Sequence, residues 1–176
     1  MLFRSMQWYS GAGPQEPVMW FRQTISHGCG LIGMIHCAVN GVPSTMITPG
    51  SHLAEFREKA LPLKMDDRAK LLYDDVAMYE ASEAVAPYGD TAPITDDGPA
   101  GNHFIALVKG NDGHLWELEG SRKGPLDRGP LAEEEDAMSD AALNAGIRRL
   151  VEIQRQDGGD DSSLNFSCIA LAPSFD

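Results

Sequence analysis

One cysteine of this chain lies where a thiol can become a nucleophile. Cys29 follows a glycine-containing turn and precedes an apolar run, residues 31–39, that predicts a buried helix. At the start of a helix, unpaired N–H groups and the helix dipole stabilise a thiolate. The alternative is that Cys29 is a small buried side chain, the usual fate of a free cysteine. Cys37 and Cys168 lie within predicted elements, and we expect them to be structural.

A nucleophilic cysteine needs a base, and the chain has five histidines. His103 begins a predicted strand after a long loop, and His114 begins the partner strand. Position alone favours His103 only slightly over His114 as the base. His36 lies within the buried helix and His52 opens a surface helix, so both are predicted to be structural. His27 is so near the cysteine in sequence that its ring is seldom aimed at the sulfur.

A metal centre is the other chemistry that this region suggests. Two histidines and two cysteines lie close together in sequence: His27, Cys29, His36 and Cys37. Their spacing matches no usual zinc pattern, and a helix would scatter the side chains around its surface. The GxxxxGK[ST] signature is also missing from the sequence. The sequence therefore implies no metal and no cofactor.

Length and composition exclude several classes of protein. The 176 residues suffice for one domain with a sizeable core. Lys and Arg total 14 against 26 Asp and Glu, and the net charge of −12 argues against a nucleic-acid partner. The chain has no apolar run of the ~20 residues needed to span a bilayer, and no secretory signal is expected. Three cysteines do not form a disulfide scaffold, and they indicate a reducing compartment, the cytoplasm or also the nucleus.

The elements that must position these residues follow from hydrophobic periodicity and turn residues. We expect a short strand over residues 18–24, helices over 52–63, 65–82 and 132–156, a hairpin of 103–109 with 114–119, and a buried last strand over 164–172. Residues 83–102 contain three prolines, three glycines and four acidic side chains, which predicts a long loop. Such a loop inside a compact domain is either functional or disordered.

Two separate motifs, and the last predicted strand, resemble segments of one enzyme family. Residues 23–36 read QTIS-x-x-CG-x-IG-x-IH and are closed by Asn40, which resembles the active-site segment of the ubiquitin C-terminal hydrolases, a family of papain-like cysteine peptidases. HFIALV at 103–108 and DGHLWELEG at 112–120 resemble the family's histidine strand and the partner strand that follows. LNFSCIALA at 164–172 is similar to the family's final strand.

The resemblance implies an α+β papain-like fold, with a central antiparallel β-sheet flanked by helices on both sides and the nucleophile on its active-site helix. It implies that Cys29 is the nucleophile and His103 the general base, which later protonates the leaving amine. Gln23 and the Cys29 N–H would both donate hydrogen bonds to the oxyanion. Such donors lower the activation barrier by ~3 kcal/mol. Glu119 stands where the family generally has Asp, so its longer side chain must fold back to orient the imidazole.

The resemblance also implies a substrate and a domain plan. The chain would hydrolyse bonds at the C-terminal glycine of ubiquitin, or of a ubiquitin-like modifier, as a monomer, with residues 83–102 as a crossover loop that passes small adducts and flexible tails. Residues 18–176 would be the catalytic domain. Residues 1–17 are expected to be an irregular extension in place of the family's N-terminal segment. The alternative is a catalytically impaired or truncated ubiquitin-binding module.

The motif before the nucleophile departs from the family pattern. The family usually has Asn and then Ala or Ser at these two positions, and this chain has His27 and Gly28. This chain therefore lacks the Asn amide that would line the pocket and has the titratable ring of His27 in its place.

Overall fold

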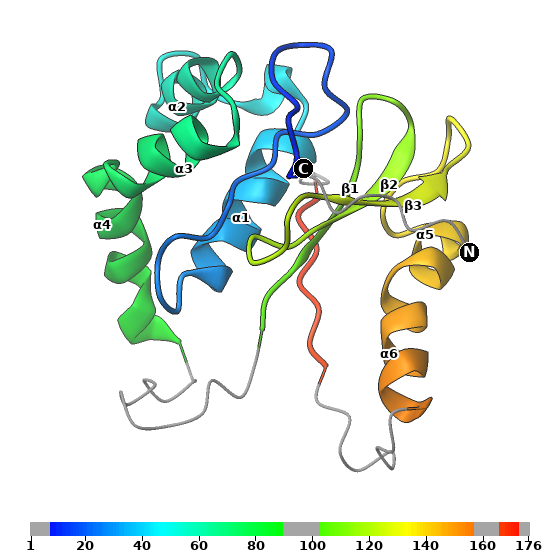
Figure 1. The fold of residues 1–176 in the computed structure, drawn as a ribbon. Coiled ribbons are helices and arrows are strands. Elements are labelled where there is room, and N and C mark those ends of the chain that lie inside the picture. Colours follow the sequence, from blue (N-terminus) through cyan, green and yellow to red (C-terminus); the bar gives the residue numbers. More distant parts are fainter. Residues whose placement is uncertain (1–7, 90–102, 157–165, 173–176) are drawn as a thin grey trace.

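Helices cover both sides of a central antiparallel sheet in the computed structural model of this chain, which describes residues 8–89, 103–156 and 166–172 (Figure 1). Within these residues the sheet has three strands, in the order β1 (Ala106–Lys109), β2 (His114–Leu118) and β3 (Leu126–Pro130). The helices are α1 (Cys29–Asn40), α2 (His52–Ala60), α3 (Met65–Tyr73), α4 (Val76–Val85), α5 (Asp140–Ala145) and α6 (Ile147–Gln156), with short 3-10 turns η1 (Ser44–Met46) and η2 (Ala86–Tyr88). The predicted α+β arrangement is confirmed.

The two faces of β1 contact different helices, because successive side chains of a strand point to opposite faces. Val108 is buried in one apolar cluster with Cys37 of α1, and it also lies beside Gly41, just after that helix. Leu107 points to the other face, toward the junction of α5 and α6. A Cβ added to Gly146 at that junction would lie 2.8 Å from Leu107 Cδ1, so this close approach requires a glycine.

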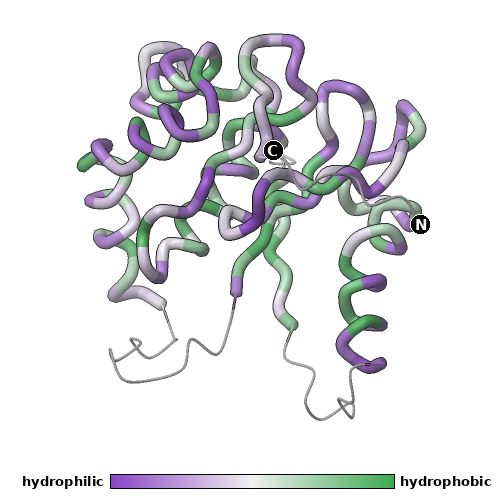
Figure 2. The backbone as a smooth tube through the Cα atoms, viewed as in Figure 1, coloured by the Kyte–Doolittle hydropathy of each residue, from purple (hydrophilic) through white to green (hydrophobic). Residues whose placement is uncertain are grey.

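The segment over residues 18–21 has the alternation of a strand but is not part of the sheet. Val18 and Trp20 are buried in a cluster with β1 and β2, and Met19 and Phe21 are buried among α1, α2 and α3. The prediction of a strand over 18–24 is therefore wrong, although the predicted alternation of side chains between two faces is present over 18–21. Figure 2 shows the hydrophobic residues concentrated where these layers meet, while α6 alternates between hydrophobic and hydrophilic residues.

Side chains of α1 take the place of a neighbouring strand for this segment. Asn40 Oδ1 accepts a hydrogen bond from the Met19 N–H (2.7 Å), and Asn40 Nδ2 donates to the Met19 carbonyl (2.9 Å). One turn earlier on the same helix, His36 Nε2 accepts from the Phe21 N–H (2.9 Å). Buried backbone groups need such partners, and residues four apart on a helix share the face that supplies them.

A buried ion pair fixes the irregular residues before this segment. The fully buried Arg68 donates from Nη1 to Glu16 Oε2 (3.0 Å) and from Nε to the Ala60 carbonyl (2.9 Å). The Tyr9 hydroxyl contacts Glu16 Oε2 (3.2 Å) and the Val18 carbonyl (3.0 Å). Burial, followed by the charge of Glu16, raises the pKa of Tyr9. Tyr9 and Glu16 therefore fix this N-terminal segment to the core.

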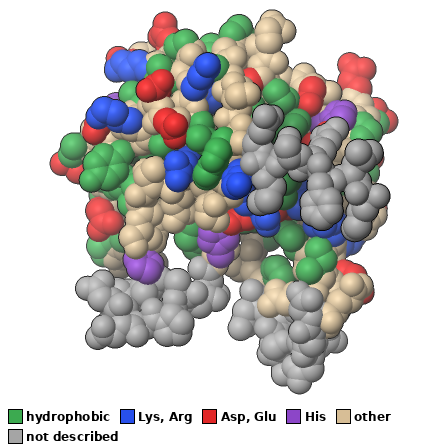
Figure 3. Space-filling model, in the orientation of Figure 1, with side chains coloured by type: hydrophobic (Ala, Val, Ile, Leu, Met, Phe, Trp, Pro, Cys, Tyr) green, Lys and Arg blue, Asp and Glu red, His purple; other side chains and the backbone are tan. Residues whose placement is uncertain are grey.

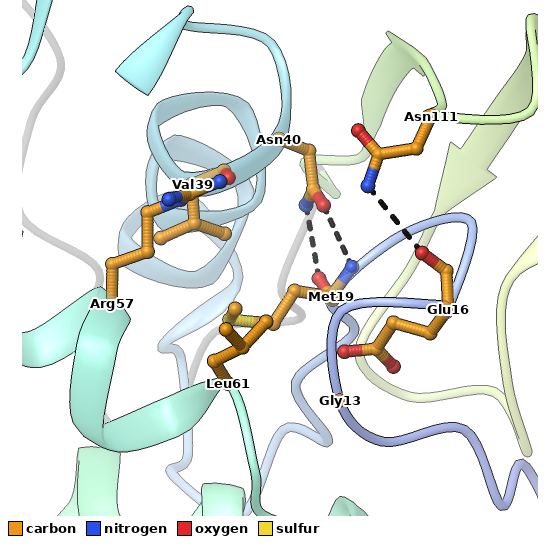
Figure 4. A pocket seen from close by; sticks show the side chains of 8 residues that line it. All are labelled: Gly13, Glu16, Met19, Val39, Asn40, Arg57, Leu61 and Asn111. Atoms are coloured by element: carbon orange, nitrogen blue, oxygen red, sulfur yellow. Dashed lines mark hydrogen bonds between the residues drawn. The ribbon is translucent and has the colours of Figure 1, made fainter. Parts of the chain in front are cut away.

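A small polar cavity lies where this N-terminal segment meets α1, α2 and the hairpin turn (Figure 4). Its volume of about 30 Å³ has room for a water molecule, and it is lined by Gly13, Glu16, Met19, Val39, Asn40, Arg57, Leu61 and Asn111. Figure 4 shows the Asn40 amide turned to the Met19 backbone and the Asn111 amide turned to the Glu16 carbonyl. The cavity is at the C-terminal end of α1, about 16 Å along the helix from Cys29.

The remaining elements agree with the periodicity in most places. The helix over 52–63 and the hairpin are confirmed, although the helix ends at Ala60 and the first strand begins only at Ala106, three residues after His103. The expected helix over 65–82 is broken, since Asp75 caps a new helix by accepting from the Met78 N–H (3.1 Å). The helix over 132–156 begins only at Asp140 and is divided at Gly146. None of the helices in the described part combines the length and apolar character needed to cross a bilayer.

Two expectations near the ends of the chain have different outcomes. Residues 166–172 are exposed and do not pair as a strand with any described residue, so the prediction of a buried last strand is wrong there. An apolar segment becomes a buried strand only where a sheet edge and a covering layer receive it. Residues 83–89 complete α4 and η2, and residues 90–102 of the expected loop lie outside the described residues.

Candidate active site

The start of α1 presents Cys29 at the positive end of the helix. Cys29 is the first helical residue, half-buried, with a free thiol. Among the described residues no side chain caps this helix, and its first turn contains no acidic residue. The first N–H groups of α1 are therefore available to stabilise a negative charge on the sulfur or beside it.

The turn before Cys29 requires an unusual backbone conformation. His27 has a φ of 57°, in the left-handed region that non-glycine residues seldom adopt and that Asn and His tolerate better than most. Gly28 follows it in a tight space, where a Cβ would lie 3.1 Å from Ile25 Cβ. The pair His27-Gly28 is thus compatible with this turn although it departs from the family pattern.

His103 and Glu119 form a hydrogen-bonded pair at the open end of the hairpin. His103 Nε2 lies 3.0 Å from Glu119 Oε1. Ala106 pairs with Leu118, so His103 and Glu119 are diagonal neighbours beyond the last paired residues, a distance that long side chains can cross. An ionised Glu119 accepts only, so Nε2 carries the hydrogen and Nδ1 is left with the lone pair that can take a proton.

The carboxylate of Glu119 is held by the residues that follow it. Ser121 Oγ donates to the same oxygen that His103 contacts, and Arg122 Nε donates to the other oxygen, Oε2. Burial raises the pKa of Glu119, but Ser121, Arg122 and His103 together outweigh burial and lower it. Glu119 is therefore a carboxylate at neutral pH. Sequence reasoning missed Ser121 and Arg122. The only signal for their contact with Glu119 was their position, two and three residues after it in sequence.

Gln23 is joined to the same end of the hairpin. Its backbone N–H donates to the Gly120 carbonyl (2.8 Å), and a Cβ on Gly120 would lie 2.9 Å from Gln23 Cβ. Gln23 Nε2 donates to the Ile25 carbonyl (3.1 Å), which orients the amide. An amide nitrogen has two hydrogens, so one stays available for an oxyanion. Gln23 Oε1 is buried and has no partner within the described part of the chain.

Phe104 packs the segment between His103 and β1 against the first turns of α1. A Cβ added to Gly30 would lie 3.7 Å from the Phe104 ring, and a Cβ added to Gly33 would lie 3.8 Å from the Phe104 Cβ. His103 is thereby carried to the end of α1 that bears Cys29. In the residues that the structure describes, no hydrogen bond joins the Cys29 sulfur to His103, and catalytic hydrogen bonds are often longer without substrate.

The glycines around Cys29 also match the spacing G-x-G-x-x-G, at Gly28, Gly30 and Gly33. In a dinucleotide fold this motif links a strand to a helix and approaches a pyrophosphate. Here the preceding turn includes His27 and follows no strand, and Phe104 lies beside the second and third glycines. The motif therefore does not indicate a nucleotide site in this chain.

The other histidines have different surroundings. His36 is fully buried, and burial lowers its pKa to about 3, which confirms the structural role predicted for it. His52 contacts Asp75 (2.8 Å) beside a groove of about 340 Å³ between α2, α3 and α4. His114 Nδ1 contacts Asp127 (2.9 Å) on β3. Across the described residues, no cluster of three or more His, Cys, Asp or Glu could hold a metal ion.

The surface is acidic overall but mixed in detail. On the face drawn in Figure 3, acidic side chains are interspersed with Lys and Arg. Arg22 and Lys123 lie over the ring of Trp8, at 4.6 and 5.6 Å from its centroid, close in sequence to Gln23 and Arg122.

Comparison with known proteins identifies the family. A family model described as ubiquitin carboxyl-terminal hydrolase, family 1, matches residues 4–152. The chain belongs to this family. The match includes the motifs at 23–40, 103–108 and 112–120 and confirms their resemblance to the family, while residues 164–172 lie beyond it.

Individual relatives agree with this assignment. Ubiquitin carboxyl-terminal hydrolase 3 of Arabidopsis thaliana is 31% identical over 159 residues, which cover 89% of this chain and 62% of that protein. Ubiquitin carboxyl-terminal hydrolase isozyme L1 of Sus scrofa is 35% identical over 154 residues, which cover 88% of this chain and 63% of the relative. The chain thus spans somewhat less than two thirds of the length of these relatives.

Solved structures support the fold. The crystal structure of the Trichinella spiralis UCH37 catalytic domain bound to ubiquitin vinyl methyl ester superposes with a TM-score of 0.62 at 21% identity, covering 87% of this chain and 64% of that one. A second crystal structure of the same protein with the same ligand gives a TM-score of 0.60 at 20% identity, covering 87% and 57%. The predicted papain-like fold is confirmed by these neighbours.

Proposed function

We propose that the chain is a thiol-dependent ubiquitinyl hydrolase that cleaves at the C-terminal glycine of ubiquitin. The observation that carries the proposal is the meeting of two elements at one place. The uncapped start of α1 bears Cys29, and Phe104, the neighbour of His103 in the segment before β1, lies against the first turns of that helix. A cysteine at a helix start and an oriented imidazole are the parts of a thiol nucleophile and its base.

In the proposed reaction, His103 Nδ1 takes the thiol proton of Cys29 while Glu119 holds Nε2. The sulfur attacks the carbonyl carbon of the C-terminal glycine, and the resulting oxyanion accepts hydrogen bonds from the Gln23 amide and the Cys29 N–H. His103 then protonates the leaving amine, alcohol or thiol, which departs as the thioester forms. Water, losing its proton to His103, hydrolyses the thioester and releases the free carboxylate and the thiol.

Three observations support ubiquitin as the substrate. The family model and the relatives are described as ubiquitin carboxyl-terminal hydrolases, and the UCH37 crystal structures contain a ubiquitin vinyl methyl ester. The net charge of −12 suits the arginines beside the final glycines of ubiquitin's tail. We extend the proposal to a monomer in the cytoplasm or nucleus, with a catalytic domain over residues 18–176 and a crossover loop that follows α4 and η2 within the predicted range 83–102.

The test is hydrolysis of a fluorogenic amide of the ubiquitin C-terminus by the full chain in reducing buffer. We expect turnover that Cys29→Ala abolishes, and that Cys168→Ala leaves unchanged because that exposed thiol lies outside the site. Absence of turnover by the unaltered chain contradicts the proposal. If ubiquitin still binds in that case, the chain is a binding module.

A further inference from the structure

Residues 119–122 form a turn in which Ser121 and Arg122 fold back onto the side chain of Glu119. The turn is closed by the Arg122 N–H, which donates to the Glu119 carbonyl (3.3 Å). Ser121 Oγ reaches Glu119 Oε1, the oxygen that His103 contacts, and Arg122 Nε reaches Oε2. Both carboxylate oxygens therefore have partners besides the imidazole.

Arg122 is itself anchored to a second carboxylate. Its Nη2 lies 3.7 Å from Oε1 of Glu117, a residue only 1% exposed two positions before Glu119 on the same face of the hairpin. Arg128 of β3 donates from Nε to the other oxygen of Glu117 (2.8 Å). Arg122 therefore bridges a buried, fixed carboxylate and the carboxylate that orients His103. The planar, forked guanidinium suits this double contact, which an ammonium cannot reproduce.

Glu119 needs such a support for a physical reason. Its side chain has three rotatable bonds, so an unsupported carboxylate could turn away from the ring. Without it, either imidazole nitrogen could carry the hydrogen, and only the form with hydrogen on Nε2 leaves Nδ1 ready to act as a base. The side chain of Glu119 is only 12% exposed, so water competes weakly for the carboxylate.

We propose that Arg122 is a positioning residue that acts through Glu119 to hold His103 in the tautomer with hydrogen on Nε2. Ser121 assists from the same turn. The effect of this role on catalysis rests on the proposed function, but Arg122 positions Glu119 whether or not the chain turns over a substrate. The tautomer of the His103 ring can therefore be measured directly.

The experiment records the nitrogen NMR signals of His103 in the full chain labelled with ¹⁵N-histidine, above the pH at which the ring is protonated. Arg122→Gln is compared with Lys123→Gln, a neighbour that loses the same charge and whose ammonium lies over the Trp8 ring. We expect the unaltered chain and Lys123→Gln to show the Nε2–H tautomer. We expect Arg122→Gln to show a mixture of tautomers, and Arg122→Lys to restore the signal only in part.

Steady-state rates give a second reading. Arg122→Gln should lower kcat about tenfold with KM within twofold, because a misplaced catalytic group slows chemistry more than binding. The same ¹⁵N spectra show whether Arg122→Gln is still folded, through the signals of buried His36. A folded Arg122→Gln chain with an unchanged tautomer, or a Lys123→Gln chain with the same mixture, overturns the inference. A chain without turnover whose His103 tautomer still depends on Arg122 contradicts the proposed function and leaves the positioning role standing.

Discussion

The hairpin carries a histidine–carboxylate pair at each end, and the two pairs have nearly the same contact distance. At the open end, His103 Nε2 lies 3.0 Å from Glu119, and near the turn, His114 Nδ1 lies 2.9 Å from Asp127. Their surroundings differ. The Glu119 side chain is 12% exposed and is held by the turn that follows it, while that of Asp127 is 45% exposed.

The pair near the turn has a structural explanation. Asp127 also accepts a hydrogen bond from the Gly129 N–H (2.8 Å), next to the irregular pairing of β2 with β3. Gly129 has a φ of +106°, so this carboxylate stabilises a bend of β3 that only glycine adopts easily. A histidine–carboxylate contact therefore does not by itself indicate catalysis. What distinguishes His103 is its neighbour Phe104, which lies against the first turns of α1, the helix that begins at Cys29.

The largest expected difference between the two pairs is in turnover. His103→Gln should lower kcat on a fluorogenic ubiquitin amide by about 10³-fold, because general acid–base catalysis contributes on this scale. His114→Gln should keep kcat within twofold, since His114 and Asp127 lie at the turn end of the hairpin, opposite the end that bears His103. Equal losses in the two variants would show that the pairs do not differ in function.

Gln23 belongs only to the His103 end, and its removal should have the next largest effect. Gln23→Ala should lower kcat by about 10²-fold with little change in KM, because an oxyanion donor acts on the transition state. Thr24→Ala, the exposed neighbour, is the matched control and should behave like the unaltered chain. A rise in KM without a fall in kcat would assign Gln23 to substrate binding instead.

Glycines at the two ends give a smaller contrast. A Cβ on Gly120 would meet the Gln23 backbone at 3.0 Å, so Gly120→Ala should displace Gln23, lower kcat by about tenfold and lower the free energy of unfolding by about 1–3 kcal/mol. Gly113 has a φ of +77° and open space around it. Gly113→Ala should cost about 1–2 kcal/mol from backbone strain and leave kcat unchanged. Urea unfolding and rate measurements on both variants check this, and a slow Gly113→Ala chain would contradict it.

The smallest expected effect is a pH-dependent stability. The hydrogen bond to Asp127 raises the pKa of His114 above 6.5, so the stabilisation is complete below pH 6.5 and is lost as pH rises through the folded-state pKa. His114→Gln should thus lower the midpoint of thermal unfolding at pH 5.5 and leave it unchanged at pH 9. The depressed pKa of Glu119 has the opposite sign, and its stabilisation is lost only as pH falls below the ordinary carboxyl range. A His114→Gln deficit that grows toward pH 9 would contradict this assignment.

Local patterns predicted the elements that depend on local physics. The apolar run after Cys29 forms α1, and the turn before His114 has Gly113 in the left-handed conformation that a tight hairpin needs. β3 was missed because LDRGP has no alternating apolar pattern. It forms through pairing with β2 and through the ion pair of Arg128 with buried Glu117.

Contacts between distant segments lay beyond those patterns. An alternating segment such as 18–21 indicates a strand, and only the folded chain shows that side chains of α1 bond its backbone. The family resemblance, and not local pattern, predicted the candidate site, and the catalytic roles of its residues stay predictions. Ser121 and Arg122 could not be found in this way, because their contact with Glu119 depends on how a four-residue turn folds back.

The central claim, that His103 activates Cys29, is tested most directly by the rate at which ubiquitin vinyl methyl ester modifies the chain, with the modified residue located by peptide mass spectrometry. The account predicts one adduct, on Cys29, formed equally fast by the unaltered chain and His114→Gln and about a hundredfold more slowly by His103→Gln. An adduct on Cys37 or Cys168, or equal rates for the two histidine variants, would contradict it.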